Sequence, residues 1–302
     1  MFLSGFSPLL LLVITLIDSV VYGLYSTYYI RKYIKAESGY YLKNAVVCAF
    51  VCLIICIIEK FSFALSALTI VLGLLFGIAT LAQGIVNSKA INIGPWSYTT
   101  VIANFSTVIT AISGYLIFSD PAPSVWKYIG IAFMFASMAM SVNYKNQSGG
   151  KPNVKWFVLS VASMLLSASV GLLQKWHQST NAKDELMGFL MISFAFSTIL
   201  SFIIYFIYRN KEKKSGADAE SKGSFLTIMV SLCLMGLMTA IMNIINLYLS
   251  GKIESAVFFP IVNGVPLIAS VVFSFVIFKE KLSKNQIIGL IAGLAGIALL
   301  CI

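Results

Sequence analysis

Asp18 stands inside a long apolar stretch of the chain. It lies about ten residues into the run 7–30, and at about 1.5 Å per helical residue this places the carboxylate near the middle of a bilayer. An Asp at the centre of a membrane helix costs about 2.5–3.5 kcal/mol to insert, so we expect it to face a cavity or a partner and to have a function. Reversible binding of a proton or another cation is the chemistry that a single carboxylate offers. The alternative is a structural role, with the carboxylate hydrogen-bonded to neighbouring polar groups.

Two tyrosines follow Asp18 on the same helical face. Tyr22 and Tyr25 stand four and seven residues after it, which in a helix brings the three side chains together. A carboxylate beside aromatic rings can hold an amine or another cation by charge and cation–π attraction. Both rings can equally pack against neighbouring helices without contacting a ligand.

Amide side chains recur inside later apolar stretches. A buried amide in a membrane needs a partner, so these groups either bridge helices or line a polar path. Pro260 and Pro266 flank one of them, and proline frees backbone carbonyls and kinks a helix, which favours a cavity there. The candidate substrate-binding residues are Tyr22, Tyr25, Gln83, Asn87, Tyr98, Asn104, Asn243, Asn246 and Asn263.

Other kinds of site find little support in the sequence. Hydrolase motifs and phosphate-binding loops are absent, so we expect no enzyme activity, no cofactor and no use of ATP by this chain. Cys48, Cys52 and Cys56 share one helix face, but neither His nor an acid accompanies them. We expect these thiols to pack as small apolar side chains rather than to bind a metal.

The composition limits the class of protein. Of the 302 residues 59% are hydrophobic and 11% are charged, and the mean hydropathy is +0.92. A soluble domain cannot bury that much apolar surface, so we expect an all-α polytopic protein whose partner is the lipid bilayer. The net charge of +10 does not indicate nucleic-acid binding, because the basic residues flank apolar spans.

Ten apolar windows predict ten membrane helices. A polar segment with Gly and Pro separates the first five from the last five, which assigns 1–146 to a first repeat, 147–153 to a linker and 154–302 to a second repeat. Because five is odd, the two repeats are expected to cross the membrane in opposite senses. The predicted helices are 7–30, 40–58, 62–88, 94–118, 124–143, 154–176, 186–208, 224–250, 254–278 and 284–302.

One pattern occurs in both halves. In each copy an apolar span ends in Ile-Phe, one further residue and an acid, which is Asp120 in the first copy and Glu280 in the second. A short polar turn and a second apolar span follow, and in the second copy this span is Gly-rich from Gly289 to Gly296. The repeat resembles the drug/metabolite transporter (DMT) superfamily, specifically its ten-helix EamA-like branch, over essentially the whole chain.

The resemblance implies a function as well as a fold. It implies two inverted five-helix repeats around a cavity lined by helices 1, 3, 4, 6, 8 and 9, and transport by alternating access. By analogy, the preferred version is export of a small polar or amphipathic metabolite, an amino acid or related amine, with protons as one option for coupling through Asp18. The alternatives are uptake of a quaternary amine or other organic cation, and translocation of a lipid carrier.

The resemblance and the sequence also raise narrower expectations. Lys89 or Lys175 could bind an anionic substrate, as basic residues do in sugar-phosphate carriers of the superfamily, or could reach the lipid headgroups. Gly289, Gly293 and Gly296 allow close helix contact, either within the chain or in a homodimer. The protein is therefore expected to be a monomer or a homodimer.

The basic residues also predict an orientation in the cell membrane. Sixteen of the 21 Lys and Arg residues flank the ends at which the odd-numbered helices finish, and five flank the opposite ends. Positively charged flanks stay in the cytoplasm, so this distribution places both termini outside. The resemblance implies the reverse, with both termini inside.

Overall fold

The computed structural model describes residues 5–34, 36–93, 99, 102–103, 105–141, 153–214, 224–278 and 283–300. These residues are helical and contain no strand, which confirms the predicted fold class. The helices are α1 (Pro8–Tyr33), α2 (Glu37–Ile58), α3 (Ala67–Ile93), α5 (Ser106–Ile117), α6 (Val125–Ser141), α7 (Val154–Gln178), α8 (Leu186–Lys214), α9 (Phe225–Ser250), α10 (Ser255–Phe278) and α11 (Lys284–Leu300), with a short 3-10 helix η2 (Lys183–Glu185) before α8.

Apolar helices occur at all ten predicted places. Within the described residues, six are long and apolar enough to cross a bilayer: Pro8–Ile30, Glu37–Ile58, Ala67–Asn87, Val154–Gln178, Lys183–Lys214 and Phe225–Ser250. Shorter apolar helical stretches occupy the other four places: Ser106–Ile117, Val125–Met140, Ser255–Pro266 and Ile287–Leu300. The chain is therefore a multi-pass membrane protein.

Local sequence determines where several helices begin. Ser7 accepts a hydrogen bond from the Leu10 N–H at 3.2 Å, and Pro8 occupies the first helical turn of α1, where its missing N–H is not needed. Asn153 caps α7 in the same way, through the Trp156 N–H at 2.8 Å. Side-chain oxygens thus satisfy backbone donors that the helix itself leaves unpaired.

The start of α3 differs from the prediction. The helix begins at Ala67 rather than at residue 62, because Lys60 and Phe61 adopt positive φ angles of 49° and 60° and the Ser66 hydroxyl caps the Thr69 N–H at 3.3 Å. An apolar window cannot show this, since the residues of the loop are as apolar as those of the helix.

Three contacts between helices recur as counterparts when the two halves are exchanged. The exchange replaces α1 by α7, α2 by α8, α3 by α9, α5 by α10 and α6 by α11. The contact of α1 with α9 then becomes that of α7 with α3, and both are present. The same holds for α2 with α9 and α8 with α3, and for α1 with α10 and α7 with α5. This pattern is the one that two inverted repeats about a pseudo-two-fold axis produce.

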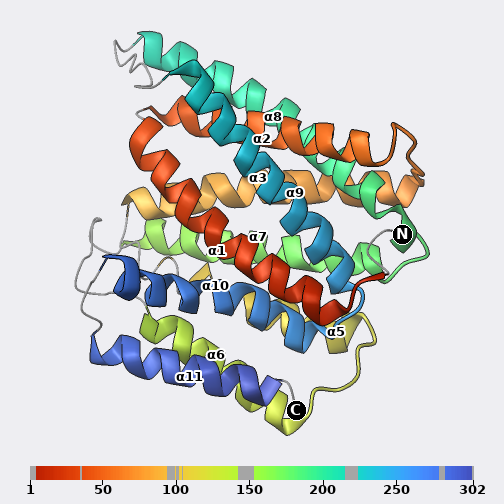
Figure 1. The fold of residues 1–302 in the computed structure, drawn as a ribbon, viewed down its shortest axis with the longest axis vertical. Coiled ribbons are helices and arrows are strands. Elements are labelled where there is room, and N and C mark those ends of the chain that lie inside the picture. The colour runs from red at the N-terminus through yellow and green to blue at the C-terminus, as the bar shows by residue number, and fades with distance from the viewer. Residues whose placement is uncertain are drawn as a thin grey trace.

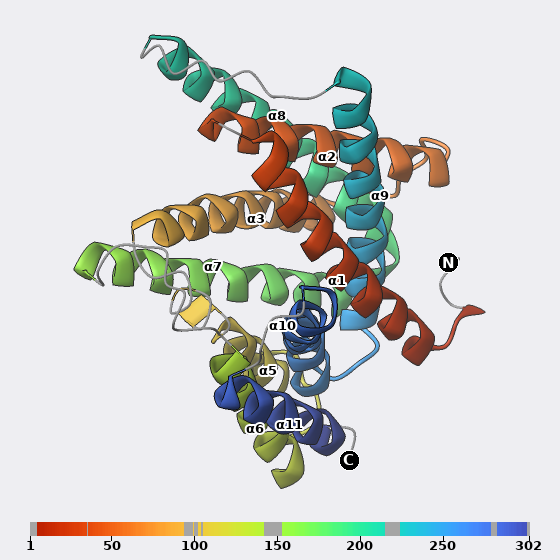
Figure 2. The ribbon, with the colours of Figure 1, turned by 60° about the vertical axis from the view of Figure 1, so that its left-hand side comes forward.

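Three contacts each join a helix to its own counterpart in the other half, and these pairs lie along the pseudo-two-fold axis. They are α2 with α8, α5 with α10 and α6 with α11. The pair α2 and α8 lies at one end of the long dimension of the molecule, and α6 and α11 at the other (Figures 1 and 2). The predicted linker 147–153 lies outside the described residues except for Asn153, so the domain boundaries remain predictions.

The small residues of α11 pack within the chain. A Cβ atom added at Gly296 would lie 3.1 Å from the Gly130 carbonyl oxygen on α6, and one at Gly293 would lie 2.6 Å from the Ser137 hydroxyl. Gly293 and Gly296 therefore allow α11 to approach α6 closely, which is one of the two uses that the sequence left open for them.

Candidate functional site

Asp18 lies in the middle of α1, which packs on α9 and α10 of the other half. Its Oδ2 atom is buried and has no hydrogen-bond partner among the described residues. The neighbouring Ser19 hydroxyl points elsewhere: it donates to the Thr15 carbonyl at 2.7 Å and contacts Met242 Sδ at 3.4 Å. A buried carboxylate oxygen without a donor is costly, and binding a proton or a cation removes that cost.

Tyr22 connects Asp18 to other polar groups. Its hydroxyl interacts with the side chains of Thr239 on α9 and Ser26 on α1, and it also lies within electrostatic range of Asp18. Tyr22 and Tyr25 both pack against an apolar cluster formed by Tyr29, Tyr33, Val47, Leu232 and Met235. Both rings therefore pack against neighbouring helices, and a role of Tyr22 or Tyr25 in binding a cation stays a prediction.

Two of the candidate amides bridge helices of opposite halves. Asn246 Oδ1 on α9 accepts a hydrogen bond from Thr15 on α1 at 3.0 Å, and Asn87 Oδ1 on α3 accepts one from Ser163 on α7 at 3.3 Å. These helix pairs exchange under the pseudo-two-fold, so the two bonds are related. In this conformation both amides therefore act as structural bridges.

The remaining candidate residues do not take part in these two bridges. Asn243 donates to the Thr239 carbonyl of its own helix at 2.9 Å, and Gln83 makes no hydrogen bond within the described residues. Asn263 donates to the Thr107 hydroxyl on α5 at 3.1 Å, and its side chain is exposed. Tyr98 and Asn104 lie outside the described residues. Unlike Asn87 and Asn246, the amides of Gln83, Asn243 and Asn263 therefore do not take part in the hydrogen bonds that join α1 to α9 and α3 to α7.

Lys43 is a further polar residue within the helices. It lies inside α2, and its Nζ atom contacts the Ser26 hydroxyl on α1 at 2.9 Å. Lys43 is one of the sixteen basic residues assigned above to helix flanks, although the predicted span 40–58 contains it. A lysine within a predicted span was the signal that could have identified it.

Asp120 forms the centre of a polar cluster between the halves. Its carboxylate accepts hydrogen bonds from the Ser255 N–H at 2.9 Å and the Ser255 hydroxyl at 2.7 Å, at the first turn of α10. Lys175 Nζ lies 2.9 Å from the same carboxylate, and Lys127 pairs with Glu254 at 2.6 Å nearby. Lys175, a candidate for binding an anionic substrate, is therefore already neutralised by an acid of the chain.

The surroundings of Asp120 keep it ionised. Its burial favours the neutral acid, but the hydrogen bonds from Ser255 and the ion pair with Lys175 outweigh this effect and hold the pKa of Asp120 below its usual value. Gly114 makes the arrangement possible, because a Cβ atom there would collide with Ser255 and lie 2.6 Å from the Asp120 carboxylate.

Two other carboxylates cap helices in the same manner. Glu185 Oε2 accepts from the Ser66 N–H and hydroxyl, both at 2.8 Å, just before α3. Glu212 of α8 accepts from the Ser38 N–H at 2.9 Å and the Ser38 hydroxyl at 2.5 Å, at the start of α2. In each case a serine of one half binds an acid of the other half. We call the pairs Asp120–Ser255, Glu185–Ser66 and Glu212–Ser38 the cross-half caps.

The two ends of the helical bundle can be named from these residues. The Asp120 end is where α1 and α10 begin and α7 finishes, and it lies on the right of Figure 1. The Lys43 end is where α1 and α8 finish and α2 begins, on the left of the same view. The Asp120 and Glu185 caps lie at the Asp120 end, and the Glu212 cap lies at the Lys43 end.

The described residues contain no group of three His, Cys, Asp or Glu side chains able to hold a metal. Cys52 and Cys56 pack against Met191 on α8, with the Cys56 and Met191 sulfur atoms 3.9 Å apart.

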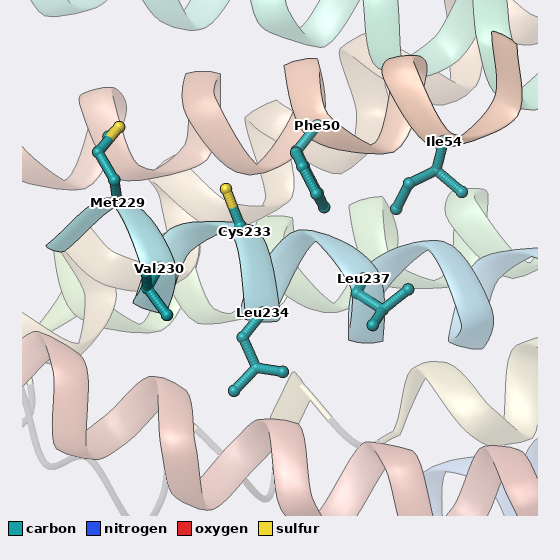
Figure 3. A pocket seen from close by; sticks show the side chains of 7 residues that line it. All are labelled: Phe50, Ile54, Met229, Val230, Cys233, Leu234 and Leu237. Atoms are coloured by element: carbon teal, nitrogen blue, oxygen red, sulfur yellow. The ribbon is translucent and has the colours of Figure 1, made fainter. Parts of the chain in front are cut away.

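A groove of about 450 Å³ lies between α2 and α9 (Figure 3). Its lining is entirely apolar, so it suits an acyl chain better than a polar metabolite. The residues that line it are Phe50, Ile54, Met229, Val230, Cys233, Leu234 and Leu237.

Comparison with known proteins agrees with this architecture. Residues 154–302 match the EamA-like transporter family, and no curated protein matches the chain. One solved crystal structure of a protein has a TM-score of 0.71 at 9% sequence identity, covering 97% of this chain and 96% of that chain, a likeness that shows a shared fold alone. Residues 154–302 belong to the EamA-like transporter family, and this match places the chain in the drug/metabolite transporter superfamily of membrane transporters.

Proposed function

We propose that this chain is a secondary transporter that moves a small polar or amphipathic metabolite, an amino acid or related amine, by alternating access. Export is the proposed direction and Asp18 the proposed proton or cation site. The observation that carries the proposal is the buried Asp18 Oδ2 atom without a hydrogen-bond partner, on a helix that packs against the other half. Such a carboxylate can bind a proton in one conformation and release it in another, which couples protonation to the relative position of the halves.

The proposed substrate site extends from Asp18 to the amides of both halves. Tyr22 contributes an aromatic face beside the carboxylate, and Gln83, Asn243 and Asn263 retain hydrogen-bonding capacity for a ligand. Asn87 and Asn246 would contact substrate only after exchanging their bonds to Ser163 and Thr15. Tyr25, Tyr98 and Asn104 complete the set proposed from the sequence.

Two observations favour other substrates of the same transport mechanism. The proximity of the Tyr22 ring to the Asp18 carboxylate equally suits a quaternary amine or another organic cation that is taken up. The apolar groove between α2 and α9 would suit the chain of a lipid carrier. Each of these ligands belongs in the experiment below.

The proposal is tested with purified protein in liposomes under an imposed pH gradient. Labelled amino acids, amines, a quaternary amine and a lipid carrier are offered in turn, and accumulation is followed with and without the gradient. We expect gradient-driven movement of an amino acid or amine, and its reduction to the level of protein-free liposomes in Asp18→Asn. The control Asp184→Asn changes an exposed acid of η2 and should behave as the unmodified protein. Unaltered coupling in Asp18→Asn would contradict the role of Asp18.

A further inference from the structure

The polar groups around Asp18 are distributed unequally between the two ends of the bundle. Towards the Lys43 end, Asp18, Tyr22 and Ser26 lie four residues apart on one face of α1, and Lys43 contacts the last of them. Towards the Asp120 end, Thr15 is bonded to Asn246, and Leu11 is buried in a cluster that contains Leu249, Phe258 and Phe259. Hydroxyl groups therefore continue from Asp18 in one direction, and apolar side chains close the other.

The polar side chains from Lys43 through Ser26 and Tyr22 to Asp18 form a nearly continuous line. Lys43 Nζ is 2.9 Å from Ser26 Oγ, and the Tyr22 hydroxyl interacts with Ser26 and with Thr239. Tyr22 and Asp18 act on each other electrostatically without a hydrogen bond to Asp18 Oδ2, so the path requires water between them. Hydroxyls and water both donate and accept, which is the property that a proton relay requires.

Few other ionisable groups can act on Asp18. Two of the helices that pack on α1 contribute no charge: α9 carries Cys233 and Tyr248 as its titratable residues, and α10 carries none over Ser255–Phe278. Around Lys43, α2 itself adds Glu37, Tyr41 and Cys48. From α8, Tyr208 stacks on Tyr41, and Glu212 is engaged by Ser38.

We propose that Tyr22, Ser26 and Lys43 form the path by which protons reach Asp18, and that Lys43 is a positioning residue at its mouth, at the Lys43 end. The inference rests on the proposed function of Asp18 and adds the side from which the site is loaded. In the transfer step the Lys43 ammonium gives a proton to Ser26, Ser26 gives one to Tyr22, and Tyr22 gives one through water to the carboxylate. A hydronium ion of the solvent at the bundle end then returns a proton to Lys43 and becomes water, so every group of the path regains what it donates.

We expect the Lys43 charge to act on Asp18 at long range. Eight helical residues separate Asp18 from Ser26, which at about 1.5 Å each puts the Lys43 charge roughly 12 Å from the carboxylate. A positive charge favours the ionised acid. At an effective dielectric constant of about 20, its removal should therefore raise the pH at which Asp18 titrates, by about 0.5–1 unit.

The experiment follows protonation of Asp18 directly, without a substrate. Purified protein in liposomes is treated with dicyclohexylcarbodiimide, which adds to protonated carboxyl groups in apolar surroundings, and the adduct on Asp18 is quantified by mass spectrometry from pH 5 to 9. In the unmodified protein we expect the adduct to decline as pH rises. Lys43→Met should shift the midpoint upward by about 0.5–1 unit, whereas Lys43→Arg should restore it.

Matched variants separate this effect from a general disturbance. Lys252→Met removes an exposed charge at the Asp120 end and should leave the midpoint unchanged. Tyr22→Phe and Ser26→Ala keep every charge, so they should slow labelling after a rapid drop in pH while the midpoint stays in place. These two variants also test the path if Lys43→Met does not fold.

The outcomes distinguish the two proposals. An adduct that titrates identically in Lys43→Met and Lys252→Met, with unchanged rates in Tyr22→Phe and Ser26→Ala, overturns the path but leaves Asp18 as a proton site. If Asp18 forms no adduct at any pH while other carboxyl groups of the protein react, the proposed function of Asp18 itself is wrong, and the path falls with it.

Discussion

Two amides of this transporter join the halves through equivalent hydrogen bonds. Asn246 accepts from Thr15 on one side of the pseudo-two-fold, and Asn87 accepts from Ser163 on the other. Both donors are hydroxyls that are fully buried among helices, where an unpaired polar group is costly. We therefore interpret each bond first as a stabilising bridge, and only secondarily as a pair of groups that a rearrangement of the halves frees for a ligand.

This interpretation predicts an energetic coupling between Thr15 and Asn246. In a double-mutant cycle with Thr15→Val and Asn246→Leu, the coupling energy should be about 0.6 kcal/mol and no more than about 1.7 kcal/mol, the range measured for such bonds in membranes. Reversible unfolding in mixed detergent micelles provides the free energies. Thr198→Val is the control, because Thr198 donates to its own helix at Phe194 and should be additive with Asn246→Leu. Additivity of Thr15 and Asn246 would instead leave Asn246 free to bind ligand.

The sequence identified side chains at this scale better than it identified their partners. Asp18 could be predicted because it is the single acid deep in an apolar span, and its cost of insertion is independent of the rest of the fold. Lys43 could not be connected to it, because the contact with Ser26 depends on how α2 lies against α1. For Asn87 and Asn246, residue type alone left bridging and ligand binding as equal alternatives.

At the scale of helices, the cross-half caps fix where α2, α3 and α10 begin relative to the opposite half. Each acid accepts from the backbone N–H and hydroxyl of a serine at a helix start, where donors lack partners and the helix dipole favours a negative charge. The start of α10 depends most on its cap, because Lys175 adds an ion pair there.

Removing the charge of Asp120 should therefore destabilise the protein. We expect Asp120→Asn to lower the free energy of unfolding by about 1–3 kcal/mol, since it weakens the bonds to Ser255 and leaves Lys175 without its anion. Gly114→Ala should have a similar effect with the carboxylate intact, because its Cβ atom would displace Ser255. Asp184→Asn serves as the control, and thermal unfolding in detergent is the measurement. Wild-type stability in both variants would show that the cap contributes nothing.

The same cap predicts a dependence on pH. The pKa of Asp120 is lower in the folded protein than in the unfolded chain, so its contribution is fully present above the unfolded pKa of about 3.9. As pH falls further, through the folded pKa, the acid becomes protonated and this stability is lost. Unfolding followed from pH 6 down to pH 3 should show a decline that is smaller in Asp120→Asn. An identical decline in both proteins would assign the loss to other acids.

Helix positions were largely predictable, whereas contacts between helix ends were not. All ten apolar windows correspond to helices, because about 20 apolar residues suffice to define a membrane span. The repeated acid after Ile-Phe marked Asp120, but its binding to Ser255 joins residues far apart in the chain and across the two halves. The start of α3 was placed too early, because the turn at Lys60 and Phe61 leaves no mark on hydropathy.

The two ends of the molecule differ in charge, although the pseudo-two-fold relates one half of the chain to the other. Most Lys and Arg residues flank the Lys43 end, and the Asp120 end holds two cross-half caps and few basic groups. An inverted repeat is compatible with either orientation, because its two halves already face opposite ways. The distribution of basic residues between the two ends is therefore what can determine the orientation of the protein in the membrane.

That distribution predicts that the Lys43 end faces the cytoplasm and that both termini lie outside. The five native cysteines are first replaced by Ala, and single cysteines are then introduced at Lys213, an exposed residue of α8 at the Lys43 end, or at Lys252, exposed at the Asp120 end. A membrane-impermeant maleimide applied to intact cells should label position 252, and should reach position 213 only after the membrane is opened.

The opposite labelling pattern would show that the basic flanks do not set the topology, and that the termini lie inside as the resemblance to EamA-like transporters implies. Labelling of both positions in intact cells would mean that copies insert in both senses, and this too would contradict the charge argument. The answer also locates the proton path, because Tyr22, Ser26 and Lys43 open at the end marked by position 213. With that end in the cytoplasm, this path would join Asp18 to the inside of the cell, which is the side on which an exporter driven by inward proton flow exchanges its proton for substrate, because a chain of hydroxyls conducts protons in both directions.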